Sequence, residues 1–145
     1  MKTNELQIGD MVIHGFGHPG RITAIDDLTV TVYDDGLDDG DGNCEVNFAI
    51  NEISPIEVTR ELIEKNGFSR VFEFEIEGRK GVHIYQSDDK RILINDDENM
   101  TNTFNKWNLH VDTEDMSSMM YCELTYFHQL QQMLRYCGIE KEFKL

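Results

Sequence analysis

The sequence predicts an α+β fold, with a small closed β-barrel over residues 1–56 and an α+β portion over residues 57–145. Three observations support this prediction. Apolar residues in the first fifty positions alternate in short runs with turn residues between them, as in half-buried strands. The hydrophobic period changes near Pro55. Near the C-terminus, apolar residues fall three and four positions apart, which is typical of one face of a helix.

The N-terminal portion contains four short runs with strand alternation. A glycine-rich turn over residues 15–20 and a turn at Asp26 and Asp27 separate the first three runs, and an acidic loop precedes the fourth. Closure into a barrel is expected because it removes exposed sheet edges. The residues expected on these strands are Met11, Val12, Ile13 and His14; Ile22 and Ala24; Leu28, Val30 and Val32; and Val46, Phe48 and Ile50.

The second portion is expected to begin with a short helix. Residues 54–56 predict a turn, and Thr59 can cap a helix whose apolar face contains Leu62 and Ile63. Gly67 is expected to end this helix. Because the connection at residues 54–56 is too short to act as a flexible linker, we expect both portions to form one compact unit.

Period-two alternation then predicts an antiparallel meander. Its core face is expected to carry Phe72, Phe74 and Ile76, with Tyr85 on the opposite face. The strands are expected at residues 71–76, 82–85, 91–94 and 107–111, with a hairpin turn over residues 78–81 and a polar loop over residues 96–103.

The last predicted element is an amphipathic helix over residues 125–136 that packs on the meander. Thr125 is the expected N-cap and Gly138 the expected C-terminal stop. The remaining residues, 139–145, are expected to form a short edge strand. The apolar stripe of the helix consists of Tyr126, Phe127, Leu130, Met133, Leu134 and Cys137.

The strongest compositional signal is charge. Twenty-eight acidic and thirteen basic residues give the 145-residue chain a formal net charge of −15. Such a surface is repelled by phosphate backbones and anionic lipid, so we expect neither direct nucleic-acid binding nor membrane binding. The charge has two interpretations: it confers solubility, or it forms a surface that meets a basic partner, including one that imitates nucleic acid.

Targeting and cysteine patterns favour the cytoplasm. The N-terminal segment lacks the apolar core of a signal peptide, and no run approaches the roughly 18 apolar residues of a membrane span. The three cysteines, Cys44, Cys122 and Cys137, have no C-x-x-C spacing, which supports neither a disulfide framework nor a structural zinc site.

The N-terminal portion resembles SH3-like or Tudor-like barrels of bacterial proteins. The residues that carry the resemblance are IGDMVIHGFGHPGRITAID, LTVTVYDDG and INEISPIEV. The C-terminal barrel of UvrD-type helicases shows the same G-D-x-V-x-H, glycine turn and apolar-Pro-Ile-Glu pattern, and CarD-type modules look related. This resemblance implies a protein-interaction module, and it covers about one third of the chain.

The rest of the chain resembles an uncharacterised group of small proteins found in phages and mobile elements of gut bacteria. The resemblance rests on PIEVTRELIEKNGF, residues 55–68, and YFHQLQQMLRYCGIE, residues 126–140. It implies a barrel, a short helix, a meander and a final helix, and it brings no activity with it.

The acidic loop over residues 34–45 is a candidate metal site. Oxygen ligands at Asp39, Asp41, Asn43 and Glu45 would suit calcium, and the first three match the first, third and fifth positions of an EF-hand loop. Cys44 and Ile50 then stand where that loop requires its turn glycine and bidentate glutamate. A solvated hairpin loop is the competing interpretation.

Histidines and aromatics supply the remaining candidates. His14 and His18 can approach each other across the glycine-rich turn, without a third ligand at matching spacing. Tyr33 and Phe48 are either core residues or the lining of a ligand groove in the barrel. His128 and Gln131, three apart on the final helix, form either a polar partner surface or a helix side that packs on the sheet.

These patterns favour a non-enzymatic protein-interaction module that binds a host protein. The negative net charge of the chain suggests that this host protein is basic. The sequence contains no catalytic motif such as G-x-S-x-G, a P-loop or H-E-x-x-H, and it implies no cofactor. The alternatives are an acidic nucleic-acid mimic that inhibits a DNA- or RNA-binding protein, a calcium-binding domain, and an enzyme.

Overall fold

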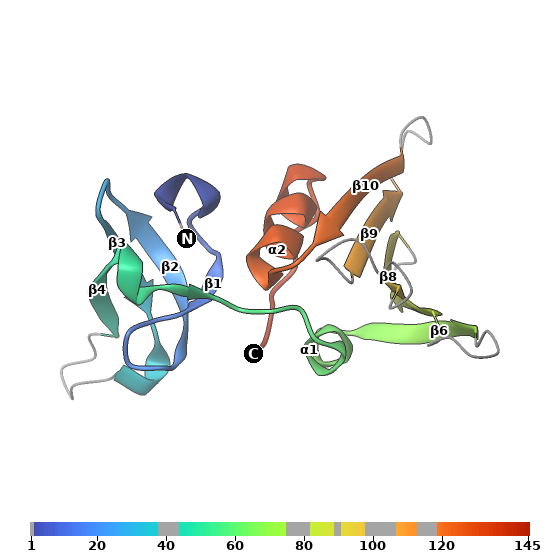
Figure 1. The fold of residues 1–145 in the computed structure, drawn as a ribbon, viewed down its shortest axis with the longest axis horizontal. Coiled ribbons are helices and arrows are strands. Elements are labelled where there is room, and N and C mark those ends of the chain that lie inside the picture. Colours follow the sequence, from blue (N-terminus) through green and yellow to red (C-terminus); the bar gives the residue numbers. More distant parts are fainter. Residues whose placement is uncertain (1, 38–43, 75–81, 89–90, 98–106, 113–118) are drawn as a thin grey trace. The chain divides into compact units, whose positions relative to one another are not determined.

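The computed structural model describes residues 2–37, 44–74, 82–88, 91–97, 107–112 and 119–145. The described chain is mostly β-structure, with two five-stranded sheets and two α-helices, which makes it an α+β fold (Figure 1). It divides into two compact units, Met1–Ile56 and Glu57–Leu145. The boundary between the two units lies where the hydrophobic period changes.

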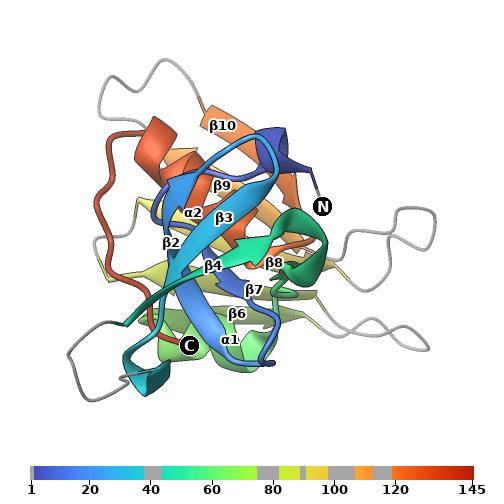
Figure 2. The same ribbon diagram turned by 90° about the vertical axis from the view of Figure 1, so that its left-hand side faces the viewer.

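The first unit contains one antiparallel sheet with the strand order β4-β3-β2-β1-β5 (Figure 2). Consecutive strands pair with each other from β1 to β4, and β5 returns to pair with β1. The strands are β1 (Met11–Ile13), β2 (Pro19–Ile25), β3 (Thr29–Tyr33), β4 (Glu45–Ala49) and β5 (Ser54–Pro55), and the short 3-10 helices are η1 (Thr3–Glu5), η2 (Asp35–Leu37) and η3 (Ile50–Glu52).

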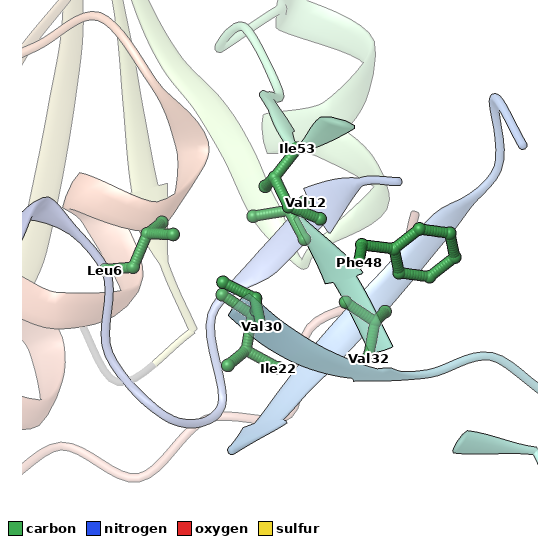
Figure 3. Packing of buried hydrophobic residues seen from close by; sticks show 7 residues of the cluster. All are labelled: Leu6, Val12, Ile22, Val30, Val32, Phe48 and Ile53. Carbon is green, nitrogen blue, oxygen red and sulfur yellow. The ribbon is translucent and has the colours of Figure 1, made fainter. Parts of the chain in front are cut away.

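The core of the first unit sits on one face of this sheet (Figure 3). Alternate strand positions point to the same face, so each of the strands β1 to β4 delivers one or two apolar side chains to it, and Leu6 and Ile53 join them from outside the strands. Burying such a side chain contributes about 1.5–3 kcal/mol to folding. The core consists of Leu6, Val12, Ile22, Val30, Val32, Phe48 and Ile53.

Several expected strand positions lie elsewhere. A register shift between Ile22 and Ala24 interrupts the alternation on β2, so Ala24 is exposed and Ile25 packs against the core instead. Leu28 lies in the β2–β3 turn and is 75% exposed. The predicted turn at Ser54 and Pro55 is strand β5, whose position at a sheet edge suits a proline.

The second unit contains an antiparallel meander, and each strand pairs with the next in the order β6 to β10. The predicted meander is therefore present, with a fifth strand, β10, that was not predicted. Its elements are α1 (Arg60–Lys65), β6 (Phe68–Phe74), β7 (Val82–Ser87), β8 (Ile92–Asp97), β9 (Trp107–Asp112), β10 (Met119–Leu124) and α2 (Phe127–Tyr136).

The buried face of the meander is the one opposite to our prediction. Tyr85 is completely buried, whereas Ile84 is half-buried and Phe72 is 50% exposed. The extra residue Val71 shifts the β6–β7 register, so that Phe72 pairs with Ile84 and Glu73 with His83. The side chains of Phe74 and Ile76, and the predicted turn over residues 78–81, lie outside the described residues.

Helix α2 supplies the second layer of this unit and lies alongside β10 (Figure 1). Its buried positions repeat at three- and four-residue spacing, as the predicted stripe requires. The N-cap is Tyr126 and not the predicted Thr125. The Gln129 side chain, in the first turn, accepts hydrogen bonds from the backbone N–H groups of both residues. Gly138, with φ +70°, follows its C-cap, Cys137. The buried residues are Phe127, His128, Leu130, Gln131 and Leu134.

Helix α1 begins and ends as predicted. The Thr59 hydroxyl accepts a hydrogen bond from the Leu62 N–H at 3.2 Å. Gly67, with φ +78°, reverses the chain after the last turn, so that the buried Phe68 starts β6. At six residues this helix is too short to be stable alone, so its packing against β6 maintains it.

The C-terminal tail is not the predicted edge strand. It is held by the C-cap residue of α1: the Asn66 amide donates to the carbonyls of Leu62 and Lys144, each at 2.8 Å, and accepts from the Lys144 N–H at 2.7 Å. Lys141 lies 5.2 Å from the centre of the Phe68 ring. Side-chain hydrogen bonds therefore replace a strand ladder at this end of the chain.

Gly20→Ala should destabilise the first unit. An added Cβ would lie 2.3 Å from Val32 Cγ1 and 3.0 Å from the Tyr33 carbonyl oxygen, which forces a core strand to move. We expect a loss of about 1–3 kcal/mol, measured as faster amide hydrogen exchange in β1–β3. Gly15→Ala is the matched control, because its Cβ would make only ordinary contacts at 3.4 Å. Equal effects of both substitutions would contradict the packing argument.

Asn66→Asp should release the C-terminal tail. The carboxylate cannot donate to the Leu62 and Lys144 carbonyls, and it places a negative charge against both oxygens. We expect a loss of about 1–3 kcal/mol and faster hydrogen exchange at the Lys144 amide. Asn51→Asp adds the same charge at an exposed position and should leave that amide unaffected. Unchanged exchange in Asn66→Asp would show that the tail is held by other contacts.

Candidate functional site

A cluster of aromatic and titratable side chains lies where the β1–β2 turn meets β3 and β4. We call it the His14 corner and define it by His14, Phe16, His18, Asp34 and Phe48. Two backbone hydrogen bonds close the turn, His14 N–H to the His18 carbonyl at 3.0 Å and Gly17 N–H to the His14 carbonyl at 2.8 Å. The turn also requires the φ of +82° at Gly17, which glycine adopts readily.

The His14 imidazole is the centre of the corner, and its side chain is fully buried. Its Nε2 lies 3.0 Å from Asp34 Oδ2, and its Nδ1 accepts a long hydrogen bond of 3.4 Å from the Phe16 N–H. Since an N–H donates to Nδ1, the ring proton is on Nε2, and Nε2–H donates a hydrogen bond to the Asp34 carboxylate. The end of β1 is thereby joined to the end of β3.

Asp34 uses both carboxylate oxygens. Oδ2 accepts from His14, and Oδ1 accepts from the Gly36 N–H at 2.9 Å. Burial acts to raise the pKa of Asp34, but the hydrogen bonds from Gly36 and His14, together with the charges of His14 and His18, outweigh it. The pKa of Asp34 is therefore held below its ordinary value. Asp34 remains ionised wherever the corner is intact at neutral pH.

The aromatic rings are stacked on this hydrogen-bonded base. The His14 and Phe48 rings are stacked at 4.8 Å between centroids, and Phe16 meets Phe48 edge to face at 5.2 Å. The His18 ring lies 6.2 Å from that of His14, so the two histidines do approach each other across the turn. Phe48 is buried, but Phe16 is 61% exposed. The corner therefore presents one phenyl ring to solvent on a buried support.

The first unit as a whole is strongly negative. Residues 1–56 contain eleven acidic side chains and two basic ones, Lys2 and Arg21, which gives this unit a formal charge of −9. At the corner itself, the Asp34 carboxylate lies against His14, whose ring meets that of Phe16 edge to face at 5.7 Å. The Glu52 carboxylate instead accepts a hydrogen bond from the Ala49 N–H at 2.8 Å. The exposed phenyl ring therefore lies on a strongly negative unit, with the Asp34 carboxylate in the same corner.

The structure does not bring Tyr33 and Phe48 together in one groove. Val30 and Val32 are buried on β3, so Tyr33, the next residue, points to the opposite face of the sheet. Phe48 pairs with Val30 and lies on the core face. Tyr33 instead lies under Arg21, whose guanidinium carbon is 5.7 Å from the ring centre. Phe48 is a core residue, and no groove is formed by these two side chains.

The other predicted site residues lie apart from the corner. His128 and Gln131 are buried on α2, with 3% and 4% of their surface exposed, so they pack inside the second unit as a helix side does. Glu45 is exposed on β4, and Asp39, Asp41 and Asn43 lie outside the described residues. Within the described ranges, no group of three or more His, Cys, Asp or Glu side chains is arranged to hold a metal ion.

Sequence reasoning found His14, His18 and Phe48, but it missed Phe16 and included Asp34 only as one end of the acidic loop. Phe16 lies within a glycine-rich turn, where alternation gives no information on exposure. Asp34 is one of several acidic residues close together in the chain. Its hydrogen bond with His14 joins residues twenty positions apart, and no local sequence pattern indicates such a pairing.

The stability of the first unit should depend on Asp34 at acid pH. Because the folded pKa of Asp34 is lower than its ordinary value of 3.8, its ionised form stabilises the fold. This contribution is complete above the unfolded pKa and is lost as the pH falls through the lowered folded value. In Asp34→Asn, the amide oxygen can accept from only one of the two donors, so the free energy of unfolding should be lower than in the unmodified chain near neutral pH.

The difference between the two proteins should shrink as the pH falls below 3.8. Urea unfolding at a series of pH values measures it. Asp35→Asn, at the exposed neighbouring position, serves as the control for removal of one charge. The role assigned to ionised Asp34 would be contradicted by one outcome. This is a difference in the free energy of unfolding between Asp34→Asn and the unmodified chain that stays constant from neutral pH to well below 3.8.

Comparisons with known proteins give no relative. No protein-family model matches the chain, and neither a search of curated proteins nor one of solved structures finds a match. In the part of the chain that the structure describes, none of the helices has both the length and the apolar character needed to span a membrane.

Proposed function

We propose that the protein is a non-enzymatic protein-interaction module whose first unit binds a basic segment of a host protein at the His14 corner. The observation that carries this proposal is Phe16, a 61% exposed phenyl ring fixed on a buried aromatic support, in a unit with a formal charge of −9. The proposal needs no cofactor and assigns no catalytic residue.

The rigidity of the corner supports a binding role. The Phe16 ring contacts His14 and Phe48 edge to face, and the Phe16 N–H bonds to the His14 ring. An anchor that is already ordered loses little conformational entropy when a partner binds, which leaves more of the contact energy as affinity. Aromatic residues, phenylalanine among them, are also enriched at the cores of protein–protein interfaces.

Charge specifies the chemistry of the partner. A lysine or arginine can stack its cation on the Phe16 ring, while the Asp34 carboxylate of the same corner and the negative charge of the unit attract it. The formal charge of −9 on residues 1–56 accelerates encounter with a basic surface and repels acidic ones. A basic segment with at least one side chain that can lie flat on an aromatic ring therefore fits best.

The strand arrangement supports an SH3-like barrel as the scaffold. Five short antiparallel strands in the order β4-β3-β2-β1-β5 bury one face around Val12 and Val32. This strand order, in which β5 pairs with β1, fits a small barrel of the kind that the resemblance to bacterial interaction modules suggests. The resemblance of residues 55–68 and 126–140 to phage and mobile-element proteins points to a bacterial host and a cytoplasmic setting.

Phe16→Ser should abolish capture of the partner. The full-length chain is immobilised and exposed to a bacterial host lysate at physiological salt, and bound proteins are quantified by mass spectrometry. The control is Ile8→Ser, which removes an apolar side chain of similar exposure beyond the other end of β1. With the purified partner, loss of one aromatic anchor should weaken binding by about 2 kcal/mol, which is about 30-fold.

Two results would count against the proposal. No specific partner at physiological salt would remove the binding role itself. The second result is a partner whose capture weakens as salt is raised but is the same for Phe16→Ser, Ile8→Ser and the unmodified chain. It would indicate recognition by charge alone and would favour the alternative of a nucleic-acid mimic.

A further inference from the structure

The C-terminal tail, residues 139–145, lies over the second unit as an extended strap. It runs from the end of α2 to α1 (Figure 2). Its odd-numbered residues are half-buried and its even-numbered residues are exposed, so every second side chain faces the body of the unit. None of the tail residues is fully buried. The tail therefore covers the unit without becoming part of its core.

The surface under the tail carries two aromatic rings. The Phe143 ring meets that of Phe127 edge to face at 5.1 Å, and the Lys141 ammonium lies 5.2 Å from the centre of the Phe68 ring. Phe68 and Phe127 are buried, whereas the two tail side chains that cover them are only half-buried. The tail thus shields two core rings from water, and both rings come from elements that precede it in the chain.

Side chains at the end of α1 bind the main chain of the tail. The Asn66 amide accepts a hydrogen bond from the Lys144 N–H at 2.7 Å and donates one to the Lys144 carbonyl at 2.8 Å. The Lys65 ammonium donates to the main-chain oxygen of Leu145. These bonds use only atoms that every residue other than proline carries. They therefore recognise an extended backbone and not a particular side chain.

We propose that this surface is a binding site for an extended basic segment of a partner protein, and that the tail occupies it as an autoinhibitory strap. We call it the tail site and define it by Lys65, Asn66, Phe68 and Phe127. A segment fits when it places an aromatic side chain on Phe127 and keeps its backbone extended past Asn66. An attached segment has an effective concentration on the order of millimolar, so the tail excludes weak ligands.

Charge favours a basic partner over a second copy of this chain. Residues 57–145 contain seventeen acidic and eleven basic side chains, which gives the second unit a formal charge of −6. The tail of a second copy would bring two exposed carboxylates, Glu140 and Glu142, on a chain whose formal charge is −15. Lysine or arginine at these outward positions would be attracted instead. The tail site belongs to the second unit, so it does not depend on the function proposed for the His14 corner.

A fluorescently labelled peptide with the sequence of residues 139–145 tests the tail site. Anisotropy measures its affinity for the full-length chain and for full-length Phe143→Ala, which weakens the attached tail and leaves the tail site unchanged. The attached tail lowers the apparent affinity by the fraction of molecules in which the site is open. Phe143→Ala should therefore bind the peptide about tenfold more tightly than the unmodified chain. Tyr136→Ala, which removes an exposed ring, should bind it like the unmodified chain.

Two altered peptides test the chemistry of the ligand. A peptide with Glu140→Lys and Glu142→Lys should bind Phe143→Ala more tightly than the peptide of unaltered sequence, and the difference should shrink as salt is raised. A peptide that lacks the phenyl ring of Phe143 should bind about tenfold more weakly. At millimolar concentration the basic peptide should also speed hydrogen exchange at the Lys144 amide of the unmodified chain, which tests displacement without a substitution in the protein.

Three results would overturn the proposal. The first is that neither peptide binds Phe143→Ala and that exchange at the Lys144 amide of the unmodified chain stays unchanged. The second is equal affinity of the peptide for Phe143→Ala and the unmodified chain, which would show that the tail does not cover the site. The third is a dimer of the unmodified chain that Phe143→Ala abolishes, which would assign the site to the tail of a second copy.

Discussion

Both units depend on the burial of one face of a five-stranded antiparallel sheet. A strand alternates its side chains between two faces, so the choice of the buried face decides the environment of every residue on it. In the first unit that choice buries Val12, Ile22, Val30 and Val32 and leaves Tyr33 outside the core. In the second it buries Tyr85 and carries Asp96 inward with it.

The sequence predicted the two-residue alternation of the strands, but it did not always predict which face of the sheet is buried. In the first unit, the alternating residues of β1 and β3 are mostly apolar on one side only, so the prediction of the core was confirmed for Val12, Val30 and Val32. In the meander, residues on both sides are apolar or aromatic, and the more hydrophobic set at Phe72 and Ile84 is not the buried one. Long-range pairing and the helix that covers the sheet decide this, and neither is encoded locally.

Helix signals were more reliable because caps act over a few residues. Helix α1 begins after Thr59 and ends before Gly67, as predicted. The apolar stripe of α2 is also present, but the N-cap of this helix is one residue later than predicted. Strand β10 was missed because its methionines and cysteine give a weak strand signal, and it becomes recognisable only through its pairing with β9. The candidate site was predictable only in part, since Asp34 and His14 meet across twenty residues of chain.

Two clusters of polar groups, one in each unit, show how a buried titratable side chain is accommodated. His14 lies in an aromatic stack and donates a hydrogen bond to Asp34, which accepts a second one from the Gly36 N–H. In the second unit, and among the described residues, Asp96 on β8 has Arg60 on one oxygen only. The first carboxylate thus has a hydrogen-bond donor on each oxygen and the second on one oxygen, so their tolerance to neighbouring substitutions should differ.

The charge imbalance of the first unit has a further consequence for its regulation. Within residues 1–56 the only lysine is Lys2, and residues 22–59 contain neither lysine nor arginine. Acetylation or ubiquitin attachment on lysine therefore has almost no acceptor on this surface. The affinity that we propose for a cationic partner would respond to ionic strength or to modification of that partner, but hardly to lysine chemistry on this unit itself.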